Sequence, residues 1–259
     1  MKNSRLFWQI IMVFALMAFS GQWIMVNGQK VICHRGFWDT PGSAQNSIAS
    51  LVKADSIGAF GSEFDVWMTA DGELVVNHDK VFKGVNMETS TFEQVRAIRL
   101  DNGEKLPTLD EYLAKGKELK IRLILEMKSL SDFNREDECA AKIVRKLKHY
   151  GLLDRTDIIA FSINACLAFK KLLPNTNIYY LDGDYTPKKV KNLGLKGIDY
   201  HQNALRKEHP EWVKEAKDLG VEINVWTVDD PEVLQYYINQ GVDYITTNKP
   251  VELQKLLKK

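Results

Sequence analysis

From residue 30 onward, short runs of β-favouring residues alternate with longer amphipathic stretches along the whole chain. The expected strands are Lys30–Cys33, Ser62–Met68, Glu73–Asn77, Arg122–Met127, Asp157–Phe161, Asn177–Leu181, Gly197–Tyr200, Glu222–Thr227 and Asp243–Thr246. The expected helices are Ser47–Gly58, Thr91–Leu100, Thr108–Lys117, Arg135–Tyr150, Asn164–Leu173, Pro187–Leu193, Lys207–Leu219 and Pro231–Asn239. Such alternation predicts a parallel sheet covered by helices.

The choice of sheet is between a closed (β/α)8 barrel and an open doubly wound sheet, because 259 residues suit both. Neither GxGxxG nor GxxxxGK[ST] follows the first strand, so the usual marks of a nucleotide-binding open sheet are missing. Asp71-Gly72 separates two alternating runs, which is a hairpin signal. We therefore expect one distorted (β/α)8 barrel, with Glu73–Asn77 running antiparallel to Ser62–Met68 as a small elaboration.

The amino-terminal segment differs from the rest of the chain. Two basic residues precede an apolar run at Leu6–Phe19, and small or polar residues follow it. This order is typical of a secretory signal peptide, and the run is shorter than the ~20 residues that a spanning helix needs. We predict a signal peptide over 1–27, a barrel domain over 28–259, and export to the periplasm or medium with no membrane span after cleavage. An uncleaved anchor is the alternative.

Charge and cysteine content exclude several classes of protein. The formal net charge is +1, so the chain lacks the basic excess that would indicate a nucleic-acid partner. The three cysteines, Cys33, Cys139 and Cys166, have no metal-binding spacing, and we expect them to be buried thiols.

Two carboxylates share one face of an expected strand. In Glu63-x-Asp65 both side chains point the same way, with Phe64 and Val66 on the other face. Buried like charges repel each other, and a cation relieves that repulsion. Carboxylate ligands select a hard cation such as Mg²⁺, Ca²⁺ or Mn²⁺. The alternative is a polar face that looks at solvent.

A histidine is expected beside this pair. A turn centred on Asp71-Gly72 pairs residues whose numbers sum to 143, which places His78 directly opposite Asp65. A slip of one residue would turn His78 to the other face.

Two further groups of charged residues end expected barrel strands, where barrel active sites lie. His34 can move protons near neutral pH, Arg35 can grip a phosphate, and Gly36 lets the backbone come close to a ligand. On another strand, Glu126 would complete a three-carboxylate site and Lys128 would face a phosphate. The alternatives are a surface His-Arg pair and an outward salt bridge.

Together these residues favour phosphate-ester chemistry. Two histidines suit general acid–base catalysis, and a hard cation with arginine and lysine suits the charge that develops on a phosphoryl group. Trp226 ends another expected strand and either lines the pocket or belongs to the core.

The chain resembles the glycerophosphodiester phosphodiesterases, members of the phospholipase-C-like phosphodiesterase barrels. The matching runs are HRG at 34–36, QNS at 45–47, GSEFDVWMTADGELVVNHD at 61–79, LPTLDEYL at 106–113, LILEMK at 123–128, VWTVDD at 225–230 and GVDYITTNKP at 241–250. They follow the family's order across the domain.

The resemblance implies hydrolysis of a small glycerophosphodiester to glycerol 3-phosphate and an alcohol on a distorted (β/α)8 barrel. The substrate's own glycerol hydroxyl attacks phosphorus, and water then opens the cyclic phosphate. One divalent cation, Mg²⁺ or Ca²⁺, and the expected residues complete the site. The roles implied are metal binding by Glu63, Asp65 and Glu126, acid–base catalysis by His34 and His78, and phosphate or substrate binding by Arg35, Lys128 and Trp226.

Three departures from the family pattern bear on the head group. Gln45 stands where the family usually has glutamate, Lys83-Gly84-Val85 replaces Arg-Thr-Thr, and Asn248 stands where aspartate is more usual. A phospholipase-D-like or phosphoinositide-cleaving enzyme of the same fold is the alternative function. The intact histidines and carboxylates argue against a non-catalytic binding barrel.

Overall fold

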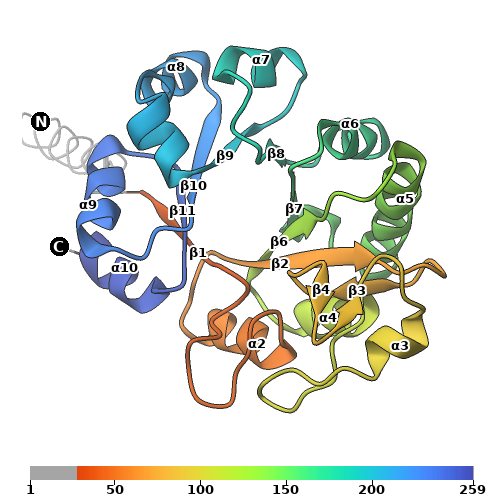
Figure 1. The fold of residues 1–259 in the computed structure, drawn as a ribbon. Helices are drawn as coiled ribbons and strands as arrows, with labels where there is room; N and C mark the ends of the chain where they lie inside the picture. Colours follow the sequence, from red (N-terminus) through yellow and green to blue (C-terminus); the bar gives the residue numbers. More distant parts are fainter. Residues whose placement is uncertain (1–27, 259) are drawn as a thin grey trace, which may run out of the picture.

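Residues 28–258, which the computed structural model describes, are built around a closed barrel of eight parallel strands (Figure 1). β1 pairs with both β2 and β11, and this closes the ring. The strands in order around the barrel are β1 (Lys30–Cys33), β2 (Gly61–Met68), β6 (Arg122–Met127), β7 (Thr156–Ala160), β8 (Ile178–Tyr180), β9 (Gly197–His201), β10 (Glu222–Trp226) and β11 (Tyr244–Thr247). The expected (β/α)8 barrel is confirmed.

Helices surround the strands on the outside of the barrel (Figure 1). They are α2 (Ile48–Ser56), α3 (Phe92–Arg96), α4 (Leu109–Glu118), α5 (Phe133–Tyr150), α6 (Ile163–Leu172), α7 (Pro187–Asn192), α8 (Glu211–Leu219), α9 (Pro231–Gln240) and α10 (Pro250–Leu257). A 3₁₀ turn covers Leu153–Arg155, and a π turn covers Ala204–Glu208. Within the described residues, no helix is long and apolar enough to cross a membrane. The predicted signal peptide over 1–27 lies outside the described residues.

Most helices begin and end at the residues that the sequence marks. Ser47 accepts the N–H of Ser50 at the start of α2, and Thr108 forms a capping box with Glu111 at the start of α4. Gly151 ends α5 in the left-handed conformation.

Two expected helices differ from the observed ones. The stretch Lys207–Leu219 is split, because Pro210 disfavours helical backbone at the residue before it and α8 begins only at Glu211. The helix expected over Thr91–Leu100 is shorter in the structure and covers only Phe92–Arg96 (α3). The chain turns back at Leu100, whose N–H donates to the carbonyl of Glu104. α10 was not expected.

Alternation along the strands divides the outer core from the barrel interior. On β6, Leu123, Leu125 and Met127 belong to the cluster that packs against the helices, whereas Ile124 packs inside the barrel with residues of other strands. Glu126 lies two residues from Ile124 and therefore also faces inward. The carboxylates of β2 follow the same rule, because Phe64 and Val66 between and beside them pack outward.

The expected hairpin is present, but its predicted register is wrong by one residue. β3 (Leu74–Val76) runs antiparallel to β2, with Val66 opposite Val76 and Met68 opposite Leu74. The paired numbers therefore sum to 142 rather than 143. Asn77, not His78, lies opposite Asp65, and its N–H donates to the Asp65 carbonyl at 3.1 Å.

The length of the turn explains this difference. The N–H of Thr69 donates to the carbonyl of Glu73, so the loop contains three residues and not two. Gly72 closes it with φ +86°, as in three-residue hairpins that end in a left-handed residue. Beyond β3 the chain bends at His78, whose carbonyl accepts the indole N–H of Trp67. A second, two-stranded hairpin, β4 (Val81–Phe82) with β5 (Val85–Asn86), follows.

Candidate active site

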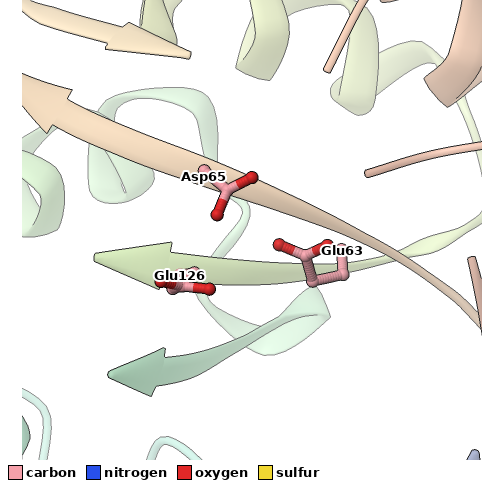
Figure 2. Close-up of side chains that lie close together, drawn as sticks. All are labelled: Glu63, Asp65 and Glu126. Carbon is pink, nitrogen blue, oxygen red and sulfur yellow. The ribbon is translucent and has the colours of Figure 1, made fainter. Parts of the chain in front are cut away.

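Three carboxylates converge inside the barrel (Figure 2). Glu63 and Asp65 come from β2, and Glu126 lies directly opposite Asp65 on the neighbouring strand β6. One oxygen from each lies within 4.8 Å of the others, and the residues are only 3, 1 and 7% exposed. The alternative of a solvent-facing polar strand is therefore excluded.

Burial and mutual repulsion dominate the ionisation of this cluster. Burial and the charges of Asp65 and Glu126 raise the pKa of Glu63 well above its usual range. Burial, and next the charge of Asp65, raises the pKa of Glu126 to about 7. Burial also opposes the ionisation of Asp65, but Lys128, His78 and a hydrogen bond together outweigh it and lower its pKa to about 2. The cluster therefore resists carrying three negative charges by itself.

Lys128 supplies a partial counter-charge. Its Nζ lies 2.7 Å from Glu126 Oε1 and 3.1 Å from Asp65 Oδ1. These two carboxylates outweigh the opposing effect of burial and raise the pKa of Lys128. Glu63 is left over, since its buried Oε1 has no hydrogen-bond partner in the part of the chain that the structure describes. Three converging carboxylates with one orphaned oxygen are a donor set that fits a hard divalent cation.

Asn46 orients one of these carboxylates, and the sequence reasoning assigned it no role. Its Nδ2 donates to Asp65 Oδ2 at 2.8 Å, and its Oδ1 accepts the backbone N–H of Asp65 at 3.2 Å. Asn46 is buried and has φ +60°, a left-handed conformation that asparagine tolerates better than most residues. Asn46 is the middle residue of the QNS run at 45–47, and this was the sequence feature that could have identified it as a site residue.

His34 is held as a neutral base at the end of β1. The amide of Asn248 donates to Asp229, and its Oδ1 accepts the indole N–H of Trp38. That orientation makes Oδ1 the partner of His34 Nδ1 at 2.9 Å, so Nδ1 carries the proton and Nε2 is free to accept one. Burial, and next the charge of Arg35, lowers the pKa of His34 to about 4.

Arg35 connects the end of β1 to the carboxylates. Its backbone N–H donates to Glu63 Oε2 at 2.7 Å from a strained conformation with φ +57°. Its Nη1 donates to Gln45 Oε1 at 2.6 Å, while its buried Nε has no partner among residues 28–258. A half-buried guanidinium with an unused donor suits an anionic ligand.

His78 reaches the site although the predicted register is wrong. The bend after β3 places it at a cavity that His34, Glu63 and Glu126 also line. Its Nδ1 lies 2.7 Å from Asp79 Oδ1, and its side chain is 37% exposed. Burial lowers the pKa of His78, and the neighbouring carboxylates of Asp65 and Asp79 oppose that shift.

Two cavities meet at His78. The inner one, of about 120 Å³, extends from the carboxylates to an apolar wall that includes Phe161, Leu181 and Trp226. The outer one, of about 560 Å³, lies toward the loops and includes Trp38 and Phe82. Six expected site residues line the inner cavity: His34, Arg35, Glu63, His78, Glu126 and Trp226. Lys128 forms ion pairs with Asp65 and with Glu126, which connects the two remaining expected residues to this group. The structure therefore brings the predicted set together.

Comparisons with known proteins agree with this geometry. Residues 34–252 match the Glycerophosphoryl diester phosphodiesterase family. A glycerophosphodiester phosphodiesterase from Caldanaerobacter subterraneus subsp. tengcongensis is 31% identical over 247 residues, which are 88% of this chain and 98% of that protein.

Solved structures agree as well. The crystal structure of a glycerophosphodiester phosphodiesterase from Parabacteroides distasonis is 48% identical, with a TM-score of 0.88 over 90% of this chain and 98% of that one. An Oleispira antarctica phosphodiesterase, solved with the product sn-glycerol-3-phosphate, shares the fold at 24% identity, with a TM-score of 0.77 over 89% of this chain and 97% of that one.

The two carboxylates of β2 should have opposite effects on stability when metal is removed. The pKa of Glu63 is raised in the folded protein, so its charge destabilises the fold as pH rises above its unfolded-state pKa. The pKa of Asp65 is lowered to about 2, so its charge stabilises the fold at neutral pH and this contribution is lost as pH falls through that value.

In EDTA at pH 8, we therefore expect Glu63→Gln to raise Tm, by roughly 2–4 °C for each kcal/mol of relief. We expect Asp65→Asn to cost about 2 kcal/mol, because its lowered pKa and its hydrogen bonds are lost. Thermal and urea unfolding of the matched pair measure both effects. Destabilisation by Glu63→Gln as large as that by Asp65→Asn would contradict this account of the cluster.

Proposed function

The chain belongs to the glycerophosphoryl diester phosphodiesterase family, and we propose that its barrel site hydrolyses glycerophosphodiesters to glycerol 3-phosphate and an alcohol, with a divalent cation and two histidines. One observation carries this proposal. Two partly exposed histidines, of which His34 is held neutral, line the same small cavity as two of the three clustered carboxylates.

His34 acts as the first base. Its free Nε2 takes the proton from the 2-hydroxyl of the glycerol half, whose oxygen attacks phosphorus. The pKa of His34, lowered by burial to about 4, keeps it unprotonated at neutral pH. Its Nδ1–H stays bonded to the neutral Asn248, and burial and the charge of Arg35 outweigh the opposing effects of Asn248 and Asp65 on its pKa.

His78 acts as the acid. As the bond between phosphorus and the leaving oxygen breaks, His78 gives that oxygen its proton, and the alcohol departs through the outer cavity. Asp79, at 2.7 Å, stabilises the protonated imidazole. His78 then accepts a proton from the water that opens the cyclic phosphate, and His34 returns its proton to the departing 2-oxygen, as microscopic reversibility requires.

Positive charge offsets the charge on the phosphoryl group. Arg35 presents its unused Nε, and its Nη1 partner Gln45 is a neutral amide that leaves the guanidinium charge available. Lys128 lies beside the carboxylates and adds a second charge. Glu63, Asp65 and Glu126 would hold Mg²⁺ or Ca²⁺ as their hard oxygen-ligated cation. Such a cation, when bound, stabilises negative charge on phosphate oxygens.

We also propose that the protein is exported. The basic start and short apolar run within residues 1–27 support this, as a signal peptide would have that order. Amino-terminal sequencing of the mature protein is expected to give a first residue between 19 and 28. An intact Met1 in membrane-bound protein would contradict the proposal.

Removal of either histidine should abolish most of the activity. We expect His34→Ala and His78→Ala each to lower kcat by about 10²–10⁴-fold on a glycerophosphodiester, because each loses a proton transfer. His149→Ala, at an exposed position near the end of α5, is the matched control and should keep wild-type kcat. Release of the alcohol and circular dichroism measure activity and folding.

Metal removal tests the other half of the mechanism. Chelation should abolish turnover, and Mg²⁺ or Ca²⁺ should restore it to wild-type protein but not to Glu63→Gln. A wild-type rate in chelator, or in a folded His34→Ala protein, would overturn the proposed mechanism.

A further inference from the structure

Asp199 is a buried acid that the proposed mechanism does not use. It lies on β9, four strands from β2 around the closed ring, and so on the opposite side of the barrel from Glu63 and Asp65. It nevertheless lines the same inner cavity as Glu63 and Glu126. It is 1% exposed, and its Oδ1 has no hydrogen-bond partner within residues 28–258.

No hydrogen-bond donor among the described residues reaches the Oδ1 atom of Asp199. Asn224 is the neighbouring side chain whose amide favours the ionised form of Asp199, and one of the two N–H groups of this amide donates to Thr246 Oγ1 at 2.9 Å. Most of the nearby cavity wall is apolar, with Ile159, Phe161 and Leu181. Burial raises the pKa of Asp199 to about 7. A buried carboxyl with an unpaired oxygen lowers the stability of the fold, and a ligand that donates a hydrogen bond to this oxygen would remove that cost.

The chemistry of that ligand group follows from where Asp199 stands. A phosphate oxygen is repelled by a carboxylate, and the cationic groups of the site lie across the cavity. The group that meets Asp199 is therefore a hydrogen-bond donor and not an anion. A hydroxyl satisfies both forms of the acid, because the ionised form accepts from it and the protonated form also donates to it.

The size of the inner cavity indicates which half of the substrate enters it. About 120 Å³ accommodates a three-carbon glycerol unit, whereas the larger outer cavity lies on the leaving-group side of His78. With phosphorus beside Arg35 and the 2-hydroxyl at His34, the terminal hydroxyl of glycerol extends away from the carboxylates. Trp226 borders this path, and its indole N–H is bonded to the Asp199 carbonyl.

We infer that Asp199 is a specificity-determining residue that binds the terminal hydroxyl of the glycerol half. This inference rests on the proposed function, and it adds the requirement that the substrate carry a glycerol unit with that hydroxyl free. A diester in which this hydroxyl is missing or esterified leaves the Asp199 oxygen unpaired, and is rejected for that reason.

The test compares two diesters with the same head group. One is glycerophosphoethanolamine, and the other has propane-1,2-diol in place of glycerol, so that only the terminal hydroxyl is missing. Wild-type kcat/KM should favour the glycerol diester by about 100-fold or more. Asp199→Ala should lower kcat/KM for the glycerol diester but not for the deoxy analogue, so that the preference between the two diesters is lost. Asp199→Asn keeps an acceptor oxygen and should retain part of the preference.

Asp182→Ala, at an exposed acid just after β8, is the control and should behave as wild type with both diesters. A structural role for Asp199 predicts a different result, namely equal losses on both diesters together with a lower Tm. Equal losses, or an unchanged preference in Asp199→Ala, would overturn the inference.

Binding of glycerol 3-phosphate and of inorganic phosphate gives a second readout that needs no turnover. Asp199→Ala should weaken binding of glycerol 3-phosphate by at least tenfold and leave binding of inorganic phosphate unchanged. If the wild-type protein hydrolysed neither diester, the proposed function would fall. Asp199 would then be judged on this pair alone, and an undiminished preference for glycerol 3-phosphate in the variant would overturn its role.

Discussion

Three carboxylates within 4.8 Å of one another inside a barrel are the constraint on which the site depends. Their repulsion is only partly offset by contacts from separate segments: the Lys128 ammonium, the Asn46 amide and the backbone N–H of Arg35. Arg35 and Asn46 both adopt left-handed backbone to make these contacts. Strain at such residues is typical of functional sites, and here it accompanies the contacts that orient Glu63 and Asp65.

The barrel mouth is divided into two halves with different chemistry. Strands β1, β2 and β6 carry the charged groups that would bind and activate a phosphodiester. Strands β7 to β10 carry an apolar wall interrupted by Asp199. His78 lines both the inner and the outer cavity, and in the proposed reaction the phosphorus would lie at this histidine with the two alcohol halves in different cavities. Under the proposed function, catalysis and recognition of the glycerol unit would therefore involve different sides of the barrel.

Part of the fold and of the candidate site was predictable from the sequence, because the alternation of side chains along a strand assigns each residue to one of the two faces. The inward pair on β2 and the barrel order followed from it. The hairpin register did not, since Asp-Gly fits both two- and three-residue loops and only the Thr69–Glu73 hydrogen bond decides between them. Asn46 and Asp199 were missed because an amide in a loop and an acid within a strand are ordinary in sequence. Asn46 matters because it contacts the carboxylate of Asp65, 19 residues away, and Asp199 because it lines the inner cavity that the carboxylates of β2 and β6 also line.

The most direct test of the carboxylate cluster is calorimetry of Mg²⁺ and Ca²⁺ binding in buffers with different enthalpies of ionisation. The pKa of Glu126 is raised to about 7 and that of Glu63 is raised as well, so a cation must displace protons from the cluster near neutral pH. The account predicts proton release at pH 7 that declines toward pH 9, and a smaller release or no binding in Glu63→Gln. Binding without proton release, or with the same release in Glu63→Gln, would contradict it.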